Sequence, residues 1–169
     1  MGVGVLLRGP SGIGKSECAL ELVRRGHRLV ADDLVRIRRA AEGTELVGSA
    51  PELIRHFMEI RGLGLLHVPD LYGSDAVAVE GPVSLVVHLE AWREDADYER
   101  IGLDRPCETL AGVDVPSLVL PLRPAASMAT LVEAAARDEI RRRQKGASGA
   151  ETLNDRFKAS VDGKTTFGG

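Results

Sequence analysis

A glycine-rich run near the start of the sequence has the residue types and spacing of a phosphate-binding loop. The pattern G-x-x-x-x-G-K-[ST] is filled by Gly9, Pro10, Ser11, Gly12, Ile13, Gly14, Lys15 and Ser16. Glycines let backbone amides curl around phosphate oxygens, and the start of a helix adds favourable partial charge. Lys15 would reach the β- and γ-phosphates of a nucleotide, and the Ser16 hydroxyl would ligate Mg²⁺.

Two adjacent acids, Asp32 and Asp33, follow the next short apolar run. Paired acids after a strand form either a solvated turn or a metal or base site, and taken alone they leave both interpretations open. The carboxyl ends of parallel strands meet at one edge of a sheet, so these acids should lie near the phosphate loop. We expect one carboxylate to face Mg²⁺ or to accept a proton from an attacking hydroxyl, and we choose Asp33 as the base.

Four further charged residues remain ambiguous when they are judged by spacing alone. Glu59 and Arg61 flank the end of a predicted helix, where they form either a surface ion pair or a catalytic pair. Arg100 and Arg123 belong to an arginine-rich chain, and most arginines in such chains are solvated. Their roles are open at this point.

Histidine and cysteine show no spacing typical of a metal site, so we assign them no chemistry. The four histidines are His27, His56, His67 and His88. The two cysteines, Cys18 and Cys107, form no short disulfide framework, which indicates a reducing cytoplasm.

Three predicted elements must position the phosphate loop and the acids. Residues 3–8 form a short apolar strand, and a helix begins near Lys15 or Ser16 and ends before Gly26. Residues 29–31 form a second strand that delivers the acids to its carboxyl end. Together they predict a compact β-α-β unit, with Cys18 packed on the apolar face of its helix.

The rest of the chain predicts a central sheet with flanking helices, which is an α/β fold. We expect a hairpin over residues 35–47, a helix over 51–60, a flexible segment over 61–66 and a loop over 92–97. Strands are expected at 77–79, 83–89 and 115–120, before Pro121 and Pro124. A helix begins at Met128 and ends at Gly146.

Composition narrows the class of protein. A chain of 169 residues with 44% apolar content is long enough for one domain with a substantial core. The net charge of −3 gives no overall reason to expect a nucleic-acid or acidic-membrane partner. No apolar run reaches the roughly 18 residues that a membrane span needs.

Several particular motifs resemble the C-terminal catalytic domain of the HPr kinase/phosphorylase family, bacterial enzymes that phosphorylate a serine of the phosphocarrier protein HPr. The matching stretches are Gly2 to Leu7, Gly9 to Glu17, Arg25 to Asp33, Gly48 to Arg55, Glu59 to Leu66, Tyr98 to Asp104 and Pro121 to Pro124. Many nucleotide hydrolases share the phosphate loop, whereas Val-Ala-Asp-Asp and Glu-Ile-Arg-Gly-Leu-Gly are much more particular. The resemblance divides the chain into a catalytic domain over 1–157 and a tail or added segment over 158–169.

This resemblance implies a fold and partners that composition does not show. The fold would be a P-loop kinase fold related in its core to phosphoenolpyruvate carboxykinase. The phosphoryl donor would be Mg-ATP, the acceptor HPr, and the assembly a homohexamer. Inorganic phosphate and pyrophosphate would serve a reverse reaction.

The resemblance also assigns roles by position. Lys15 would bind phosphate, Ser16 and Glu59 would ligate Mg²⁺, and Arg100 would be the catalytic arginine. Asp33 would accept the proton in phosphorylation and donate it in dephosphorylation. Asp32, Arg61 and Arg123 would support these residues, with residues 121–126 tied to the reverse reaction.

Two departures from the family pattern keep other functions open. The family carries a catalytic histidine before the phosphate loop, at a position that precedes this sequence. Ala125 and Ala126 stand where glycine and arginine are common, so the kinase reaction is the firmer expectation. The alternatives are an impaired nucleotide-binding or assembly module and a small-molecule kinase of related fold.

Overall fold

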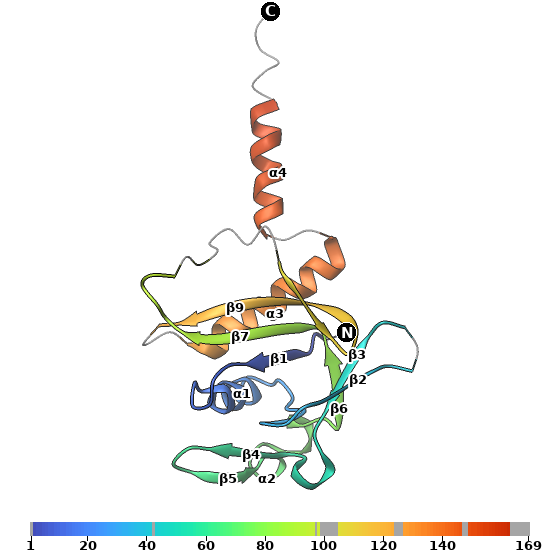
Figure 1. Ribbon diagram of the computed structural model, residues 1–169, viewed down its shortest axis with the longest axis vertical. Coiled ribbons are helices and arrows are strands. Elements are labelled where there is room, and N and C mark those ends of the chain that lie inside the picture. The colour runs from blue at the N-terminus through green and yellow to red at the C-terminus, as the bar shows by residue number, and fades with distance from the viewer. Residues whose placement is uncertain are drawn as a thin grey trace, which may run out of the picture.

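The computed structural model describes residues 2–41, 43–96, 98, 105–123, 127–146 and 149–162. At its centre lies a sheet with the strand order β1-β7-β9-β8. Figure 1 shows β1, β7 and β9 side by side. Its strands are β1 (Val5–Arg8), β7 (Leu85–Ala91), β9 (Val113–Leu122) and β8 (Cys107–Leu110). The first three are parallel, and β8 is antiparallel to β9. The phosphate loop follows β1 at the carboxyl edge of this sheet.

Alternation along β7 divides the core between the two faces of the sheet. Leu85, Val87 and Leu89 pack with residues of the helices α1 (Lys15–Arg24) and α3 (Met128–Lys145). Val86 faces the other side, where it packs with Leu46 and other buried residues. This period of two is the signature of a strand covered on both faces.

The second face is covered by an antiparallel sheet of β2 (Arg36–Arg39), β3 (Leu46–Ser49) and β6 (Glu80–Val83). The predicted hairpin over 35–47 is therefore confirmed as β2 and β3. Before β1, Gly4 lies so close to β6 that an added Cβ would sit 1.6 Å from the carbonyl oxygen of Pro82. Only glycine allows this approach of the two backbones.

A third unit is the hairpin of β4 (Phe57–Ile60) and β5 (Gly64–His67). The short helices η1 (Glu52–Ile54), α2 (Val68–Tyr72) and η2 (Ser74–Ala76) flank it. Met58, Ile60 and Val68 are buried in one cluster with Val23 of α1 and with Leu29. The hairpin is therefore packed against the helix that follows the phosphate loop.

The last helix, α4 (Gly149–Asp162), projects away from the body of the molecule (Figure 1). It continues past residue 157, across the predicted boundary between domain and tail, while residues 163–169 lie outside the described part of the chain. The division at 157 stays a prediction. In the described residues, no helix combines the length and the apolar character needed to cross a membrane.

Several expected elements were wrong in kind or extent. Residues 29–31 form only an isolated parallel bridge between Leu29 and Val77, and the parallel neighbour of β1 is β7. The predicted β-α-β unit is therefore not built from consecutive strands. The expected strand over 77–79 is likewise reduced to that bridge, and β6 begins at Glu80.

The expected helix over 51–60 is a single 3₁₀ turn followed by β4. Its apolar residues fit a helical spacing, but burial alternates along the strand: Met58 and Ile60 are inside, whereas Phe57 and Glu59 are outside. The segment 61–66, expected to be flexible, forms the turn of this hairpin and most of β5, and Gly62 and Gly64 both have φ of 88°. Long-range packing thus overrode a local pattern that fits a helix.

Proline does not stop β9 where the sequence suggested. The strand runs through Pro116 and Pro121 to Leu122. Its pairing with β8 ends at Pro116, so in the described part of the sheet the region around Pro121 is paired only with β7. A missing amide is tolerated on such an unpaired side. Strand β8 was not anticipated, whereas α3 begins and ends as predicted.

Candidate functional site

The phosphate loop joins β1 to α1 as the sequence predicted. Gly9 has φ of 155°, and a Cβ on it would lie 2.6 Å from the carbonyl oxygen of Leu89 in β7. Gly14 caps α1 with a left-handed φ of 100°, and its carbonyl oxygen accepts the Cys18 amide at 2.9 Å. The loop is thereby held close to the sheet while its backbone turns into the helix.

Lys15 folds back over the loop that precedes it. Its ammonium donates to the carbonyl oxygens of Gly9 at 3.0 Å and Pro10 at 3.1 Å. An ammonium group has three donors and swings on a flexible stem, so it can exchange these carbonyls for phosphate oxygens. The lysine is therefore placed at the loop that it is expected to serve.

Arg61 brings a second positive charge to the same loop. A Cβ placed on Gly12 would lie 3.4 Å from both terminal nitrogens of the Arg61 guanidinium. Among the described residues, no ion pair joins Arg61 to Glu59, so the expected alternative of a surface pair is wrong. A guanidinium beside a phosphate-loop glycine suits bidentate contact with phosphate oxygens.

Asp32 ties three separate segments together. Its Oδ1 accepts the Ser16 hydroxyl at 2.9 Å, and its Oδ2 accepts the backbone amide of Glu59 at 3.1 Å. The bonds join the start of α1, the segment after Leu29 and strand β4. The acids thus reach the loop although residues 29–31 do not form the expected neighbouring strand.

Asp33 stands apart from this arrangement. Its backbone takes a left-handed φ of 59°, and its side chain is exposed, without a hydrogen-bonding partner among the described residues. Aspartate is among the residues that adopt this conformation most readily, and such conformations gather at functional sites. The Asp33 carboxylate therefore has no partner among the described residues, whereas Asp32 accepts a hydrogen bond on each oxygen.

Glu59 projects its side chain from the exposed face of β4, because its neighbours Met58 and Ile60 occupy the buried face. Ser16, Asp32 and Glu59 offer the hard oxygen donors that Mg²⁺ prefers. This ion commonly takes one or two carboxylates and completes its shell with phosphate oxygens and water. The residues present therefore fit the metal that the phosphate loop implies.

Arg123 makes a contact that the sequence did not indicate. It follows β9, and its guanidinium carbon lies 3.7 Å from the ring centroid of Trp92, just after β7. Trp92 also stacks on Tyr98 with centroids 4.8 Å apart, and its amide donates to the carbonyl oxygen of Leu122 at 3.1 Å. This cation–π stack fixes Arg123 at the carboxyl edge of the sheet.

Other expected site residues fall where the structure gives no description. Arg100 and the three residues Pro124, Ala125 and Ala126 lie outside the described residues. Their proposed roles therefore remain predictions.

A charged cluster directly before the loop was missed. Glu108 of β8 accepts from Arg8, the last residue of β1, and lies 2.9 Å from Nε2 of His88 on β7. Arg8 and His88 are register partners, so the cluster spans the sheet next to Gly9. One indication of this cluster was present in the sequence, the charged residue Arg8 at the end of an otherwise apolar strand.

Cys18 has the structural role that was expected. It is 3% exposed beneath the loop, and this burial raises the pKa of its thiol to about 11. The thiol stays protonated at neutral pH and behaves as a small apolar side chain.

Comparison with known proteins adds evidence from outside the chain. Residues 1–157 match the family described as the HPr Serine kinase C-terminal domain. The HPr kinase/phosphorylase of Caldanaerobacter subterraneus subsp. tengcongensis is 52% identical over 160 residues, which cover 95% of this chain and 52% of that protein. The HPr kinase/phosphorylase of Geobacillus kaustophilus is 48% identical over 161 residues, covering 95% and 51%. The chain thus spans about half the length of the curated relatives that it matches.

A solved structure is similar to this one over most of its length. The Hpr(Ser) kinase/phosphatase from Coxiella burnetii superposes with a TM-score of 0.75 at 32% sequence identity, covering 84% of this chain and 91% of that one. The expected α/β fold with a central sheet and flanking helices is confirmed. Given the match over residues 1–157, this chain belongs to the family of HPr serine kinase C-terminal domains.

Proposed function

We propose that the chain is the catalytic part of an ATP- and Mg²⁺-dependent protein-serine kinase whose acceptor is HPr. The observation that carries this proposal is the pair of bonds made by Asp32. These bonds join Ser16, at the end of the phosphate loop, through Asp32 to the amide of Glu59 in β4, which supports a site built from these segments. These contacts are evidence from the structure itself and do not depend on the family assignment.

The proposed roles follow from which groups are free and which are engaged. Lys15 and Arg61 would bind phosphate oxygens, while Ser16 and Glu59 would hold Mg²⁺. The ion neutralises charge on the phosphates and orients them. Asp33, exposed and unpartnered among the described residues, would take the proton of the acceptor serine.

The forward reaction is a substitution at the γ-phosphorus. The serine oxygen forms a bond to phosphorus as the bond to the β,γ-bridging oxygen breaks, and ADP leaves. The proton of the hydroxyl passes to Asp33 during the transfer. Arg100 would neutralise charge that develops on the moving phosphoryl group.

A phosphorolytic reverse reaction is proposed for the same site. An oxygen of inorganic phosphate would attack the phosphorus of phosphoserine, giving pyrophosphate and serine, and Asp33 would return the proton to the serine oxygen. Arg123, which lies over the ring of Trp92 and belongs to the segment 121–126, would support this reaction. Since Ala125 and Ala126 depart from the family pattern, we propose it with the kinase reaction as the principal activity.

Assembly and location are part of the proposal. We place the enzyme in the cytoplasm as a homohexamer, on the family resemblance. Its two cysteines, Cys18 and Cys107, carry free thiols, as expected in a reducing compartment.

The test is transfer of labelled γ-phosphate from Mg-ATP to purified HPr, with an HPr variant lacking the acceptor serine as control. Labelling that depends on the serine supports the kinase. The Lys15→Ala chain should not transfer the labelled phosphate to HPr. Its circular dichroism spectrum should match that of the wild-type chain, which would show that the fold is kept. Retained nucleotide binding without labelling of HPr would favour an impaired module, and labelling of metabolites alone would favour a small-molecule kinase.

A further inference from the structure

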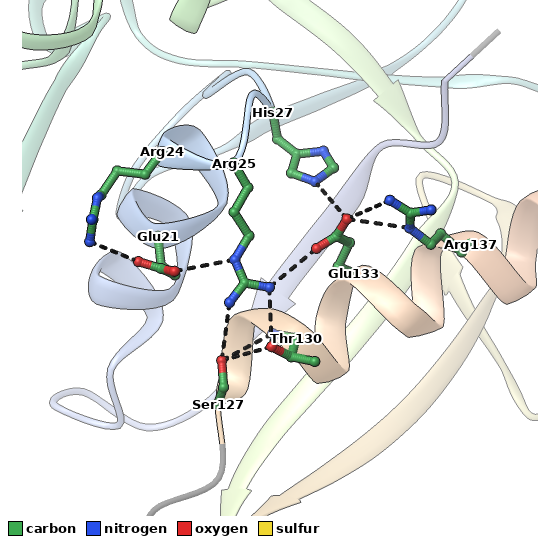
Figure 2. Close-up of polar contacts among 8 residues, drawn as sticks. All are labelled: Glu21, Arg24, Arg25, His27, Ser127, Thr130, Glu133 and Arg137. Atoms are coloured by element: carbon green, nitrogen blue, oxygen red, sulfur yellow. Dashed lines mark hydrogen bonds and ion pairs between the residues drawn. The ribbon is translucent and has the colours of Figure 1, made fainter.

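A polar network joins the end of α1 to the start of α3, and Arg25 is its centre (Figure 2). Towards α1, which ends at the preceding residue, Nε of Arg25 donates to Glu21 at 3.2 Å. Towards α3, Nη1 donates to the Thr130 hydroxyl at 3.1 Å and to Glu133 at 3.2 Å, and Nη2 donates to the Ser127 hydroxyl at 3.3 Å. Two of its four acceptors, Thr130 and Glu133, therefore lie in the first two turns of α3, and a third, Ser127, is the residue that caps this helix.

Glu133 is held as an anion within this network. Hydrogen bonds from Arg137, at 2.8 Å, and from Arg25 keep the pKa of its carboxyl below the usual range. His27, in the turn after α1, lies 3.7 Å from the same carboxylate oxygen that accepts from Arg137 (Figure 2). An ionised acceptor strengthens the bond from Arg25, because charge-assisted hydrogen bonds are about twice as strong as neutral ones.

The same turn of α3 also meets the phosphate loop. Ser127 caps α3 and accepts from the Thr130 amide, and Met128 follows it. A Cβ placed on Gly14 would lie 3.0 Å from the terminal methyl carbon of Met128. Gly14 is the residue at which the loop becomes helix α1, directly before Lys15 and Ser16. Movement of the first turn of α3 would therefore shift the phosphate loop at Gly14.

We propose that Arg25 is a positioning residue for the phosphate loop, which it steadies by holding the first turn of α3 so that Met128 stays against Gly14. This inference rests on the nucleotide binding proposed above. It gives a role to Arg25, which the proposed chemistry does not use. The guanidinium suits the role because its rigid fork can serve acceptors on two helices at once.

Arg24, the last residue of α1 and the neighbour of Arg25, provides a matched control. It carries the same charge and donates to the same Glu21, at 3.1 Å, but its side chain is 64% exposed and makes no hydrogen bond or ion pair with α3 among the described residues. A change that depends only on charge or on helix α1 would affect both arginines alike.

The experiment is titration of Mg-ATP binding to the whole chain, well below the lowest melting temperature of any variant. Arg25→Met should raise the dissociation constant about tenfold, since small displacements of binding groups have large effects. Arg24→Met should change it less than about twofold. Loss of stability by itself does not alter this constant while the chain stays folded, so the comparison reports the placement of the loop.

A second set of variants tests whether Arg25 acts on the phosphate loop through its contacts with α3. Glu133→Ala should weaken binding, and the double variant with Arg25→Met should bind no more weakly than Arg25→Met alone, because both remove one connection. Glu21→Ala should have little effect. A loss in Glu21→Ala that matches Arg25→Met, with Glu133→Ala unchanged, would overturn the inference.

Failure of the proposed function and failure of this inference give different results. A wild-type chain that does not bind Mg-ATP would contradict the proposed function and this inference with it. Wild-type binding with equal constants for Arg24→Met and Arg25→Met would overturn the inference alone. If Arg25→Met does not fold, Thr130→Val serves instead: an expected increase of about threefold would support the role, and an unchanged constant would overturn it.

Discussion

The Ser16 hydroxyl lies 2.9 Å from Oδ1 of Asp32, so the residue predicted to ligate Mg²⁺ is held by an acid from another segment. The second oxygen of Asp32 accepts the amide of Glu59. One carboxylate thus sets the relative position of the phosphate loop and β4. It leaves Asp33, the next residue, free for a different task.

Separate tasks for the two acids lead to different expected outcomes. Asp33→Asn should reduce phosphate transfer to HPr by about 10²-fold or more, because it removes the proposed base. The same variant should bind Mg-ATP nearly as well as wild type, since the Asp33 side chain has no partner among the described residues. Transfer rates and nucleotide titrations measure the two effects. Lost nucleotide binding in this variant would instead make Asp33 a metal or structural residue.

Asp32→Asn is the informative companion variant. An amide keeps one acceptor oxygen but replaces the other with a donor, so it cannot accept from both Ser16 and Glu59. Both Mg-ATP binding and transfer are therefore expected to fall. An Asp32→Asn chain that binds normally would contradict the role of Asp32 in positioning the site.

The close approach of Gly4 to β6 should make this position intolerant of any side chain. Gly4→Ala would place its Cβ 1.6 Å from the Pro82 carbonyl oxygen, and the two backbones would have to separate. We expect a loss of about 1–3 kcal/mol in the free energy of unfolding, measured by urea denaturation. Gly2→Ala is the control, because an added Cβ there meets nothing within 4 Å. Equal stability of the two variants would show that β1 and β6 can part at little cost.

The two free cysteines should differ in reactivity. Cys18 is buried with its pKa raised to about 11, so almost none of its thiol is ionised at pH 7. Cys107 is exposed at the start of β8. Brief treatment with iodoacetamide under native conditions should label Cys107 alone, as read by peptide mass spectrometry. Rapid labelling of Cys18 would mean that the core between α1 and the sheet opens readily.

Mild acid should lower the stability of the folded chain through His56, which directly precedes β4 in the β4–β5 hairpin. Burial, with the nearby charges of Arg55 and His67, lowers the pKa of His56 below its usual value near 6.5. The folded chain then binds fewer protons there than the unfolded chain, so stability falls as the pH drops below about 6.5. His56→Asn should reduce this dependence, and asparagine tolerates the φ of 70° at this position. Melting temperatures of both proteins between pH 5 and 8 measure the effect, and parallel curves would contradict it.

Residues 5–24 show how far local patterns reach. The apolar strand, the glycine-rich loop, Gly14 at the cap and the amphipathic helix lie in one continuous stretch, and the structure has them as predicted. Helix α3, with a serine at its N-cap and a glycine at its C-terminal end, was also predicted correctly. Such elements are specified by residues within one or two turns of each other, so their signals survive without tertiary context.

Elements whose partners are distant in sequence were less predictable. Residues 29–31 and 51–60 carry apolar patterns that fit more than one structure, and packing against Val77 and Val23 decided between them. Strand β8 gave little signal, because its place depends on pairing with β9. Burial on both sides of the central sheet selected these outcomes.

The sequence by itself determined the chemistry available to this protein: a phosphate loop with Lys15 and Ser16, two adjacent acids, and a set of arginines. The tertiary structure decided which of these groups meet. It brought Arg61 to Gly12, Asp32 to both Ser16 and Glu59, and Arg25 to the first turn of α3. A local sequence specifies residue types and backbone preferences, whereas contacts between distant residues form only when a shared core orients the elements that carry them.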